Sequence, residues 1–302
     1  MKTQNSNAGG LSRSAGSDRM KGILFILMAA FFFSLMSVFV RLSGDVPTMQ
    51  KAFFRNIVAA FLAAALLLRS GAGFHVKSQN IPALLLRCAF GTLGIICNFW
   101  AVDHMPIADA NMLNKLSPFF AILMSIFILR ERPKRVEWVS VILAFIGAAF
   151  VAKPGAGLAS LPALVGILGG FGAGTAYTFV RKLGLAGERG PVIVMYFSLF
   201  STLVLLPGLV LNFHPMTLRQ LVFLLLAGSS AAGGQLAITA AYQHAPARDI
   251  SVFDYSQIVY AALFGFFLFG EIPDLWSFLG YAIIIGTSFA KWYLVAERIR
   301  RK

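Results

Sequence analysis

The second half of this chain repeats the first half at a fixed offset of 140 residues. Without a gap, residues 101–133 align with residues 241–273, and nine of the thirty-three positions are identical. The identical pairs are Ala101/Ala241, His104/His244, Pro106/Pro246, Asp109/Asp249, Ala121/Ala261, Leu123/Leu263, Phe127/Phe267, Glu131/Glu271 and Pro133/Pro273. This duplication restricts the fold to architectures built from two copies of one unit.

Both copies are too apolar for a water-soluble domain. Hydrophobic residues make up 58% of the chain, charged residues 13%, and the mean hydropathy is +0.77. A membrane-spanning helix needs about 20 consecutive apolar residues. The pattern predicts ten spans, at 21–42, 49–69, 79–102, 107–130, 136–152, 161–183, 190–212, 217–243, 248–269 and 275–296. The expected fold class is therefore an all-α integral membrane protein with ten transmembrane helices.

Basic residues predict the orientation of these spans. Of the 26 Lys and Arg residues, eighteen lie on the side of the N-terminus, three on the opposite side, and five within or at the end of spans. Because positive charge concentrates in cytoplasmic loops, we expect both termini in the cytoplasm of a multi-pass cell-membrane protein. The polar residues 1–19 predict a disordered cytoplasmic tail. The basic cytoplasmic tail 298–302 is interpreted as a contact with anionic lipid and not with nucleic acid.

An odd number of spans per copy determines how the copies are related. The first copy, residues 20–155, holds spans one to five, and the second, residues 160–297, holds spans six to ten. The second copy must then enter the membrane from the opposite face. The copies are predicted to be inverted repeats, related by a pseudo-two-fold axis in the membrane plane. Such a pair offers two equivalent packings, which alternating access requires.

Each copy carries the same short motifs in the same order. They are His104-Met105-Pro106, Glu131-Arg132-Pro133 and Trp138 in the first copy, and His244-Ala245-Pro246, Glu271-Ile272-Pro273 and Trp276 in the second. With this pattern, residues 20–297 resemble the EamA-type units of the drug/metabolite transporter superfamily. One departure is Arg130 before Glu131, where such units commonly have Gly, as Gly270 stands before Glu271.

The resemblance implies a central cavity lined by the third, fourth, eighth and ninth spans. The first, second, sixth and seventh spans would move around this cavity. The fifth and tenth would lie at the periphery and form a homodimer contact. Members of the group handle amino acids, sugars, nucleotide derivatives and toxic compounds, so the resemblance does not specify the substrate.

Charged side chains inside the spans are the candidates for the site, because a charge at bilayer depth is costly unless it faces a cavity or a partner. In the fourth span, Lys115 lies about 12 Å from the predicted outer boundary at about 1.5 Å per residue. Asn111 and Asn114 share a helix face with it. These three residues form the polar cluster of the first copy.

The ninth span carries the corresponding cluster of the second copy. Asp254 lies beside Tyr255 and near Gln257; at the offset of 140, Asp254 corresponds to Asn114 and Tyr255 to Lys115. The two clusters differ in chemistry, which predicts an asymmetric site for a ligand with distinct ends. Lys115 is expected to bind an anionic group. Asp254 is expected to bind an ammonium group or a coupling proton, as the one carboxylate clearly at mid-membrane depth.

Further polar and aromatic residues within the spans complete the predicted substrate site, namely Arg55, Asn98, Trp100 and Tyr177. Structural interpretations stay open beside this one. Lys115 and Arg55 have stems long enough to reach the outer interface. Lys115 and Asp254 can also form a structural ion pair, and Asn side chains can simply join helices. Arg87 and Lys291 lie near the inner ends of their spans and are interpreted as snorkelling.

The motifs of other function classes are missing from the sequence. It contains no His-Glu-x-x-His, no Gly-rich phosphate loop, and no spacing that predicts a metal site or a cofactor. The prediction is a secondary active transporter, not an enzyme, for a small polar or amphiphilic metabolite. An amino acid or derivative is favoured, since Lys115 and Asp254 suit a zwitterion. A carrier of organic anions or nucleotide derivatives is the alternative, followed by a channel or lipid scramblase.

Overall fold

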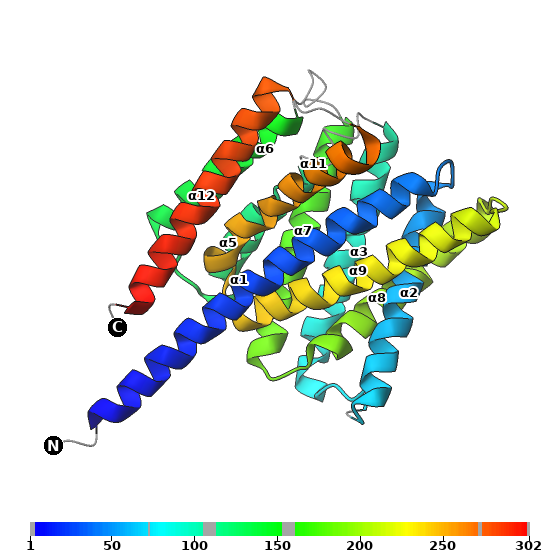
Figure 1. Cartoon of the computed structure of the whole chain (residues 1–302). Coiled ribbons are helices and arrows are strands. Elements are labelled where there is room, and N and C mark those ends of the chain that lie inside the picture. The colour runs from blue at the N-terminus through cyan, green and yellow to red at the C-terminus, as the bar shows by residue number, and fades with distance from the viewer. Residues whose placement is uncertain (1–3, 72, 105–112, 153–160, 271–273, 301–302) are drawn as a thin grey trace.

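The computed structural model describes residues 4–71, 73–104, 113–152, 161–270 and 274–300. In these ranges the regular structure is helical, and the helices pack into one bundle (Figure 1). In chain order they are α1 (Gln4–Leu42), α2 (Thr48–Arg69), η1 (Ser78–Asn80), α3 (Ile81–His104), α5 (Ser117–Leu129), α6 (Arg135–Ala152), α7 (Leu161–Leu185), α8 (Gly190–Leu211), α9 (Leu218–His244), α10 (Ala247–Ile250), η3 (Ser251–Tyr255), α11 (Ser256–Phe269) and α12 (Leu275–Arg300). The start of α1 and the end of α12 lie at the same end of the bundle.

Length and hydropathy make this bundle a multi-pass membrane protein. Within the described ranges, seven helical segments can cross a bilayer, namely Ser17–Leu42, Thr48–Arg69, Ser78–Asn98, Leu161–Leu185, Gly190–Leu211, Leu218–His244 and Ala247–Phe269. Ser117–Leu129 and Leu275–Lys291 are shorter apolar helices. The all-α membrane class is confirmed. The count of ten spans and the inverted repeat stay predictions, since residues 107–112 of the fourth span lie outside the described ranges.

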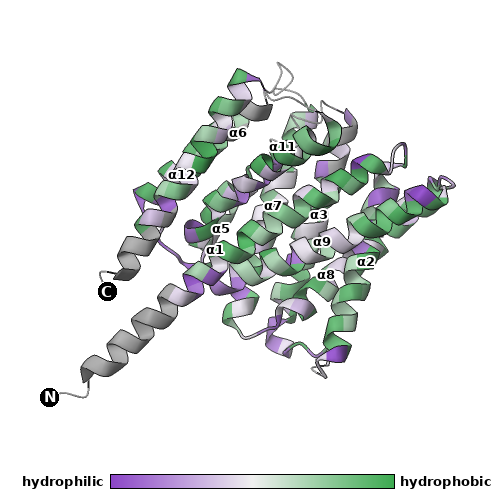
Figure 2. Ribbon diagram, in the orientation of Figure 1, coloured by the Kyte–Doolittle hydropathy of each residue, from purple (hydrophilic) through white to green (hydrophobic). Residues whose placement is uncertain are grey.

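The outside of the bundle is apolar along the helices. Figure 2 shows hydrophobic residues in green over most of the helix lengths, with hydrophilic residues in purple mainly near helix ends and connections. Large side chains project outward, among them Phe61, which is 72% exposed, and Phe267, which is 75% exposed. Apolar area of this extent is suited to contact with lipid.

Helix pairing in the bundle follows the sequence repeat. α1 packs on α9, and α3 packs on α7. α5 packs on α7, and α1 packs on α11. At the offset of 140 residues, α1 corresponds to α7, α3 to α9 and α5 to α11. The pair α1–α9 therefore corresponds to α3–α7, and α1–α11 corresponds to α5–α7. In the pairs α2–α8 and α6–α12, the two helices correspond to each other. Each half therefore buries much of its apolar surface against the other half instead of forming a separate core.

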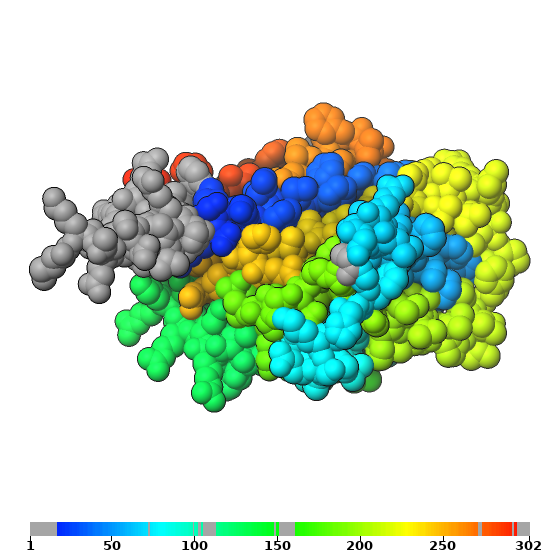
Figure 3. Space-filling model, turned by 90° about the horizontal axis from the view of Figure 1, so that it is seen from below, coloured from blue at the N-terminus to red at the C-terminus, as the bar shows by residue number. Residues whose placement is uncertain are grey.

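At both ends of the bundle, residues of one half also form hydrogen bonds with residues of the other half. At one end, Glu188 Oε1 accepts hydrogen bonds from Lys77 N at 3.1 Å and from Asn80 Nδ2 at 2.7 Å. Figure 3 shows this α2–α3 connection in cyan beside green segments of the second half. At the other end, Gln50 Nε2 donates to His214 O at 2.9 Å, and His214 N donates to Gln50 Oε1 at 3.0 Å.

The predicted fourth and ninth spans are both interrupted. Residues 115–116 form a turn before α5. Pro118, in the first turn of α5, explains the break, because its ring would clash with the carbonyl of Asn114 in a continuous helix. In the second half, the 3₁₀-helix η3 separates α10 from α11. Both spans thus contain irregular backbone near the centre of the bundle.

The two breaks contact each other through residues at equivalent positions. Tyr255 Oη donates a hydrogen bond of 2.8 Å to Lys115 O. In return, Lys115 Nζ donates to Asp254 O at 3.4 Å. Irregular backbone inside a membrane protein needs such partners, because lipid offers none. The breaks therefore position Lys115 and Asp254 beside each other.

Close approach of α7 to the first break depends on glycine. A Cβ atom on Gly170 would press on Leu113 O, and a Cβ atom on Gly174 would press on Ser117 O. In the other half, Ser34 on α1 stands at the equivalent of Gly174, and its Oγ donates to Gln257 O at 2.9 Å. Small residues on α7 and α1 thus bring these helices against the broken spans.

The departure at Arg130 has a structural consequence. α5 ends at Arg130 with φ of 55°, and α11 ends at Gly270 with φ of 66°. Both residues are in the left-handed conformation, which Gly adopts freely and which costs a residue with a side chain about 1 kcal/mol. The first half therefore keeps the helix ending of the second half at the expense of local strain.

The backbone of the N-terminal segment is described from Gln4 onward, and the disordered cytoplasmic tail at residues 1–19 stays a prediction. α1 is already helical from Gln4, so the backbone of most of residues 1–19 continues the first span. Once a helix has nucleated, each added residue gains a hydrogen bond at low entropic cost. The blue helix accordingly extends beyond the end of the bundle in Figure 1.

Candidate functional site

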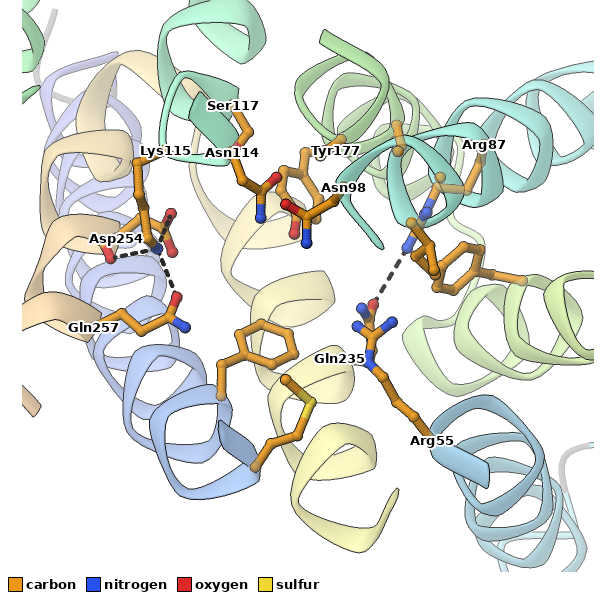
Figure 4. Close-up of a pocket in the computed structure, with 18 residues that line it drawn as sticks. Arg55, Arg87, Asn98, Asn114, Lys115, Ser117, Tyr177, Gln235, Asp254 and Gln257 are labelled. Atoms are coloured by element: carbon orange, nitrogen blue, oxygen red, sulfur yellow. Dashed lines mark hydrogen bonds and ion pairs between the residues drawn. The ribbon is translucent and has the colours of Figure 1, made fainter. Parts of the chain in front are cut away.

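A cavity of about 170 Å³ lies inside the bundle, between helices of both halves. Eighteen residues line it, and Figure 4 shows how they face one another. Those with polar or charged side chains are Arg55, Arg87, Asn98, Asn114, Lys115, Ser117, Tyr177, Gln235, Asp254 and Gln257. Ionisable groups inside an apolar bundle make this cavity the candidate functional site, because their burial is otherwise costly.

One pole of the cavity is formed by the two broken spans. Lys115 Nζ lies 3.3 Å from Asp254 Oδ2 and donates a hydrogen bond of 2.6 Å to Gln257 Oε1. The side chains of Lys115 and Asp254 are 14% and 8% exposed. Of the interpretations left open by the sequence, the ion pair between these two residues is the one observed. At this pole the two charges compensate each other.

The other pole carries two guanidinium groups. Arg87 extends from α3 with only 1% exposure, and its Nη2 donates to Gln235 Oε1 at 3.3 Å. Its Cζ lies 3.8 Å from the centre of the Phe197 ring. Arg55 reaches this pole from α2 (Figure 4). The Nε atoms of both arginines are buried without a hydrogen-bond partner among the described residues.

The interpretation of Arg87 as a snorkelling side chain is wrong. Its side chain runs along α3 towards the centre of the bundle instead of towards the membrane surface. Gly91, one turn further on, makes this possible, since a Cβ atom there would collide with Arg87 Nη1 and the Phe197 ring. Lys291 on α12 is buried too, with 3% exposure, and does not snorkel to an exposed position.

Amide and phenol groups lie between the two poles. Figure 4 places Asn98, Asn114 and Tyr177 there. Tyr177 stacks on Tyr242 with ring centres 4.9 Å apart, and Asn98 Oδ1 is buried without a partner among the described residues. A compensated ion pair, an uncharged middle and a cationic pole suit an organic ligand with chemically distinct ends. Within the described chain, no group of three or more His, Cys, Asp or Glu side chains is placed to hold a metal ion.

The structure brings most of the predicted site residues together. Seven of the ten line the cavity, namely Arg55, Asn98, Asn114, Lys115, Tyr177, Asp254 and Gln257. Tyr255 is fully buried behind them and holds Lys115 O. Trp100 is not among the lining residues and stacks on His104 with ring centres 4.0 Å apart. Asn111 lies outside the described residues.

Sequence reasoning missed Arg87 and Phe197 as members of the site. Arg87 carries the same signal that selected Lys115, a charge within an apolar run, but its position near the span end favoured a surface role. Phe197 carries no signal of its own, because it is one of 29 phenylalanines in the chain.

Comparison with known proteins agrees with this geometry. The model of the EamA-like transporter family matches this chain twice, over residues 20–153 and 160–290. The chain belongs to the EamA-like transporter family. It is thus a transporter of the drug/metabolite transporter type and not an enzyme. Each match covers one of the two halves that the 140-residue repeat defines.

Similar proteins include named transporters. The pseudopaline exporter CntI of Pseudomonas aeruginosa is 35% identical over 273 residues, which cover 89% of this chain and 95% of the exporter. A riboflavin transporter of Vibrio cholerae is 28% identical over 272 residues, with 88% and 91% coverage. A crystal structure with 16% identity has a TM-score of 0.80 over 91% of this chain and 98% of that chain, which shows a shared fold.

A second charged cluster of this EamA-like chain lies at the ends of helices. Arg19 Nε lies 3.0 Å from Asp249 Oδ2, in an ion pair without hydrogen-bond geometry. Glu131, just after α5, lies in the field of Arg248 and Arg181. Burial raises the pKa of Glu131 above its ordinary value, and the two arginines offset part of this rise. Unlike the cationic pole, this cluster contains carboxylates beside its arginines.

Proposed function

We propose that this chain is a secondary active transporter that carries a small polar or amphiphilic metabolite across the cytoplasmic membrane by alternating access. The observation that carries the proposal is the central cavity, where charged side chains of both halves meet inside an apolar bundle. The distribution of basic residues supports cytoplasmic termini. The exchange of helix pairs under a 140-residue shift supports inverted repeats, whose repacking would open the cavity to either side.

An amino acid or an amino-acid derivative is the favoured substrate class. A zwitterion can replace the contact between Lys115 and Asp254, with its carboxylate on Lys115 and its ammonium group on Asp254. The cavity of about 170 Å³ is smaller than the pockets of about 300–1,000 Å³ that hold drug-sized ligands, so it suits a ligand of amino-acid size. The exporter among the relatives supports outward transport.

Charge supports the alternative of an organic anion or nucleotide derivative. Three cations, Arg55, Arg87 and Lys115, line the cavity, against the single carboxylate of Asp254 among the described lining residues. An anionic substrate would reduce this excess of positive charge. A zwitterion with an additional acidic group satisfies both considerations.

Asp254 is the proposed site of proton coupling. It faces the cavity and holds Lys115 at 3.3 Å, so protonation would release Lys115 for a substrate carboxylate. An Asp254→Asn variant cannot exchange this proton. Its transport rate should therefore lose the dependence on an imposed proton gradient that the unmodified protein shows in liposomes.

The homodimer through the fifth and tenth spans belongs to the same proposal. α6 and α12 pack on each other at the edge of the bundle (Figure 1). Their outward faces carry apolar side chains, including Val139 at 53% and Phe278 at 58% exposure. A second copy would cover this edge. Mass measurement in nanodiscs tests it, with Phe278→Ser as the disrupting variant.

Counterflow separates a carrier from a channel or a scramblase. A thermal-shift screen of the purified protein against metabolites first identifies a ligand, because binding stabilises the state that binds. Liposomes preloaded with the unlabelled ligand should then accumulate the labelled ligand transiently, at a rate that saturates. A flux that rises linearly with concentration, without counterflow, would contradict the proposal.

A further inference from the structure

We propose that Arg55 and Arg87 form an oxoanion subsite at one pole of the cavity, where they bind a carboxylate or phosphate group of the ligand. The transport of that ligand rests on the proposed function, whereas its binding is a separate property of the folded protein. The subsite is distinct from the Lys115–Asp254 pair, which lies at the opposite pole (Figure 4). Four features of the structure support this assignment.

The first feature is that the described residues provide no counter-charge at this pole. Asp254 is the one carboxylate among the described residues that line the cavity, and it is engaged by Lys115 at 3.3 Å. Arg87 instead meets the neutral amide of Gln235. A buried charge without a partner of opposite sign is strongly unfavourable. The ligand is the natural source of the missing negative charge.

The second feature is the number of unused donors. A guanidinium group offers five N–H donors in a planar fork. Arg87 uses one of them on Gln235, at a long 3.3 Å, and no hydrogen bond from Arg55 is formed within the described residues. Both Nε–H groups are buried and have no hydrogen-bond partner in the described part of the chain. The Nε–H and a neighbouring Nη–H form the edge that binds carboxylate or phosphate in a bidentate manner.

The third feature is the direction of the two side chains. Arg55 lies about 10 Å along α2 from its start, and Arg87 lies about 9 Å along α3 from its start. The two helices run in opposite directions through the bundle, yet both guanidinium groups face the same pole (Figure 4). Both line the same cavity of about 170 Å³. An anion in this cavity would be attracted by both guanidinium groups.

The fourth feature is the rigid support of Arg87. The guanidinium group lies over the Phe197 ring at 3.8 Å, and the absence of a side chain at Gly91 leaves room for it. A stacked guanidinium group keeps its donor edge free, so that Arg87 is preorganised for an oxoanion. The cost of ordering a flexible side chain is then largely avoided on binding.

The predicted ligand therefore carries an oxoanion at one end and a second polar group. Asn98 Oδ1, which is buried and unpaired, faces the space between the poles and can accept a hydrogen bond from the body of the ligand. The ion pair of Lys115 and Asp254 can bind the far end. An amino-acid derivative with an additional acidic group has this arrangement.

Simple oxoanions test the subsite in the purified protein. Glutarate and inorganic phosphate are titrated at constant ionic strength, with glutaramide and chloride as controls, and the midpoint of thermal unfolding is measured. Glutarate, phosphate or both should raise the midpoint, and the controls should not. Arg55→Gln and Arg87→Gln should each weaken binding about 10- to 100-fold, as expected for loss of hydrogen bonds to a charged group. Arg69→Gln, at the exposed end of α2, is the matched control and should bind as the unmodified protein does.

The variant Gln235→Glu distinguishes a lost subsite from damaged folding. It is close to isosteric and places a carboxylate where Arg87 now meets an amide. The protein without ligand should become more stable, and the oxoanions should no longer stabilise it. A variant that merely misfolds would lose stability as well as binding.

The headgroup of an anionic lipid is a second source of a phosphate group for this subsite. Nanodiscs with and without phosphatidylglycerol separate it from a free oxoanion. Stabilisation by the anionic lipid that both Arg→Gln variants abolish would assign the subsite to a headgroup phosphate. The proposal is overturned if no oxoanion stabilises the protein, if the Arg variants and the unmodified protein respond equally, or if Gln235→Glu still binds. Counterflow without oxoanion binding would leave the transporter proposal standing, and binding without counterflow would leave only the subsite.

Discussion

The two halves of the chain contribute opposite charges to one cavity. The first half supplies the three cations among the described lining residues, Arg55, Arg87 and Lys115. The second half supplies Asp254, the one carboxylate among the described lining residues. Positive charge in the cavity therefore comes from one half of the chain and negative charge from the other, although the two halves form equivalent helix pairs.

The counterparts at the offset of 140 show how this difference in charge arises. At the equivalent positions of the second half, Met195 corresponds to Arg55, Ala227 to Arg87 and Tyr255 to Lys115. In each pair, the charge is present in one half alone. Positions that form helix contacts keep small or apolar residues in both halves, because packing constrains them. Cavity positions are free of that constraint, so their chemistry can differ between the halves.

The largest effect should come from breaking the contact between the halves. Asp254→Leu would leave Lys115 buried without its ion-pair partner, and we expect a loss of about 3 kcal/mol in the free energy of unfolding. The double variant Lys115→Met/Asp254→Leu should recover most of this loss, since it buries no unpaired charge. Chemical unfolding in detergent measures both. A double variant less stable than the single one would show that the pair is not mainly an electrostatic contact.

Removing one cation should affect transport strongly. Lys115→Ala deletes the group that the zwitterion model assigns to the substrate carboxylate. We expect transport to fall by about 10- to 100-fold, the value of a hydrogen bond to a charged group. Because Asp254 then loses its ion-pair partner, the thermal midpoint should also fall, so transport is compared at a temperature at which the elution profile shows folded protein. Transport at the unmodified rate would remove Lys115 from the substrate site.

The helix endings offer a comparison outside the cavity. Arg130→Gly should relieve the left-handed strain at the end of α5 and stabilise the protein by about 0.5–1 kcal/mol. Gly270→Ala should introduce the same strain at the end of α11 and destabilise it by about 1 kcal/mol. Among the described residues, the environment of Gly270 leaves a Cβ atom free of contacts within 4 Å, so the effect is expected from the backbone conformation. Effects of the same sign for both variants would contradict this account.

The smallest effect should be the pH dependence due to Glu131. Its pKa is raised in the folded protein, mainly by burial, so folding favours the protonated carboxyl. Its contribution to stability is therefore greatest below the unfolded-state pKa and is lost as the pH rises through the higher folded-state pKa. Glu131→Gln should remove this decline and flatten the stability profile in that window. Thermal midpoints measured across the acidic range check it, and an unchanged profile would exclude the effect.

Several residues that line the cavity could be predicted because the physical signal is local. A charge or an amide within an apolar span is costly at its own position, whatever its surroundings. This selected Lys115, Asp254, Arg55 and Asn98, and all four line the cavity. Trp100 was selected for its aromatic face, which carries no such cost, and it packs on His104 instead.

Other features of the site depend on distant parts of the chain. The direction of Arg87 follows from the space at Gly91 and from the ring of Phe197 on another helix. Depth along a span does not contain this information, and the snorkelling interpretation failed for that reason. The broken fourth span had a local signal in Pro118, whereas the equivalent break in the second half has no proline at the equivalent Ile258.

The sequence alone determined the membrane class, the duplicated plan and the family, because hydrophobic runs, spacing and repeats are properties of a one-dimensional pattern. The tertiary structure alone decided which charges face each other. Lys115 and Asp254 are 139 positions apart, and their contact depends on two broken helices that pack together. Arg55 and Arg87 share a pole at which the described residues place no carboxylate, because α2 and α3 direct both side chains to the same space. Electrostatic energy depends on distance and burial in three dimensions, and the order of residues along the chain specifies neither.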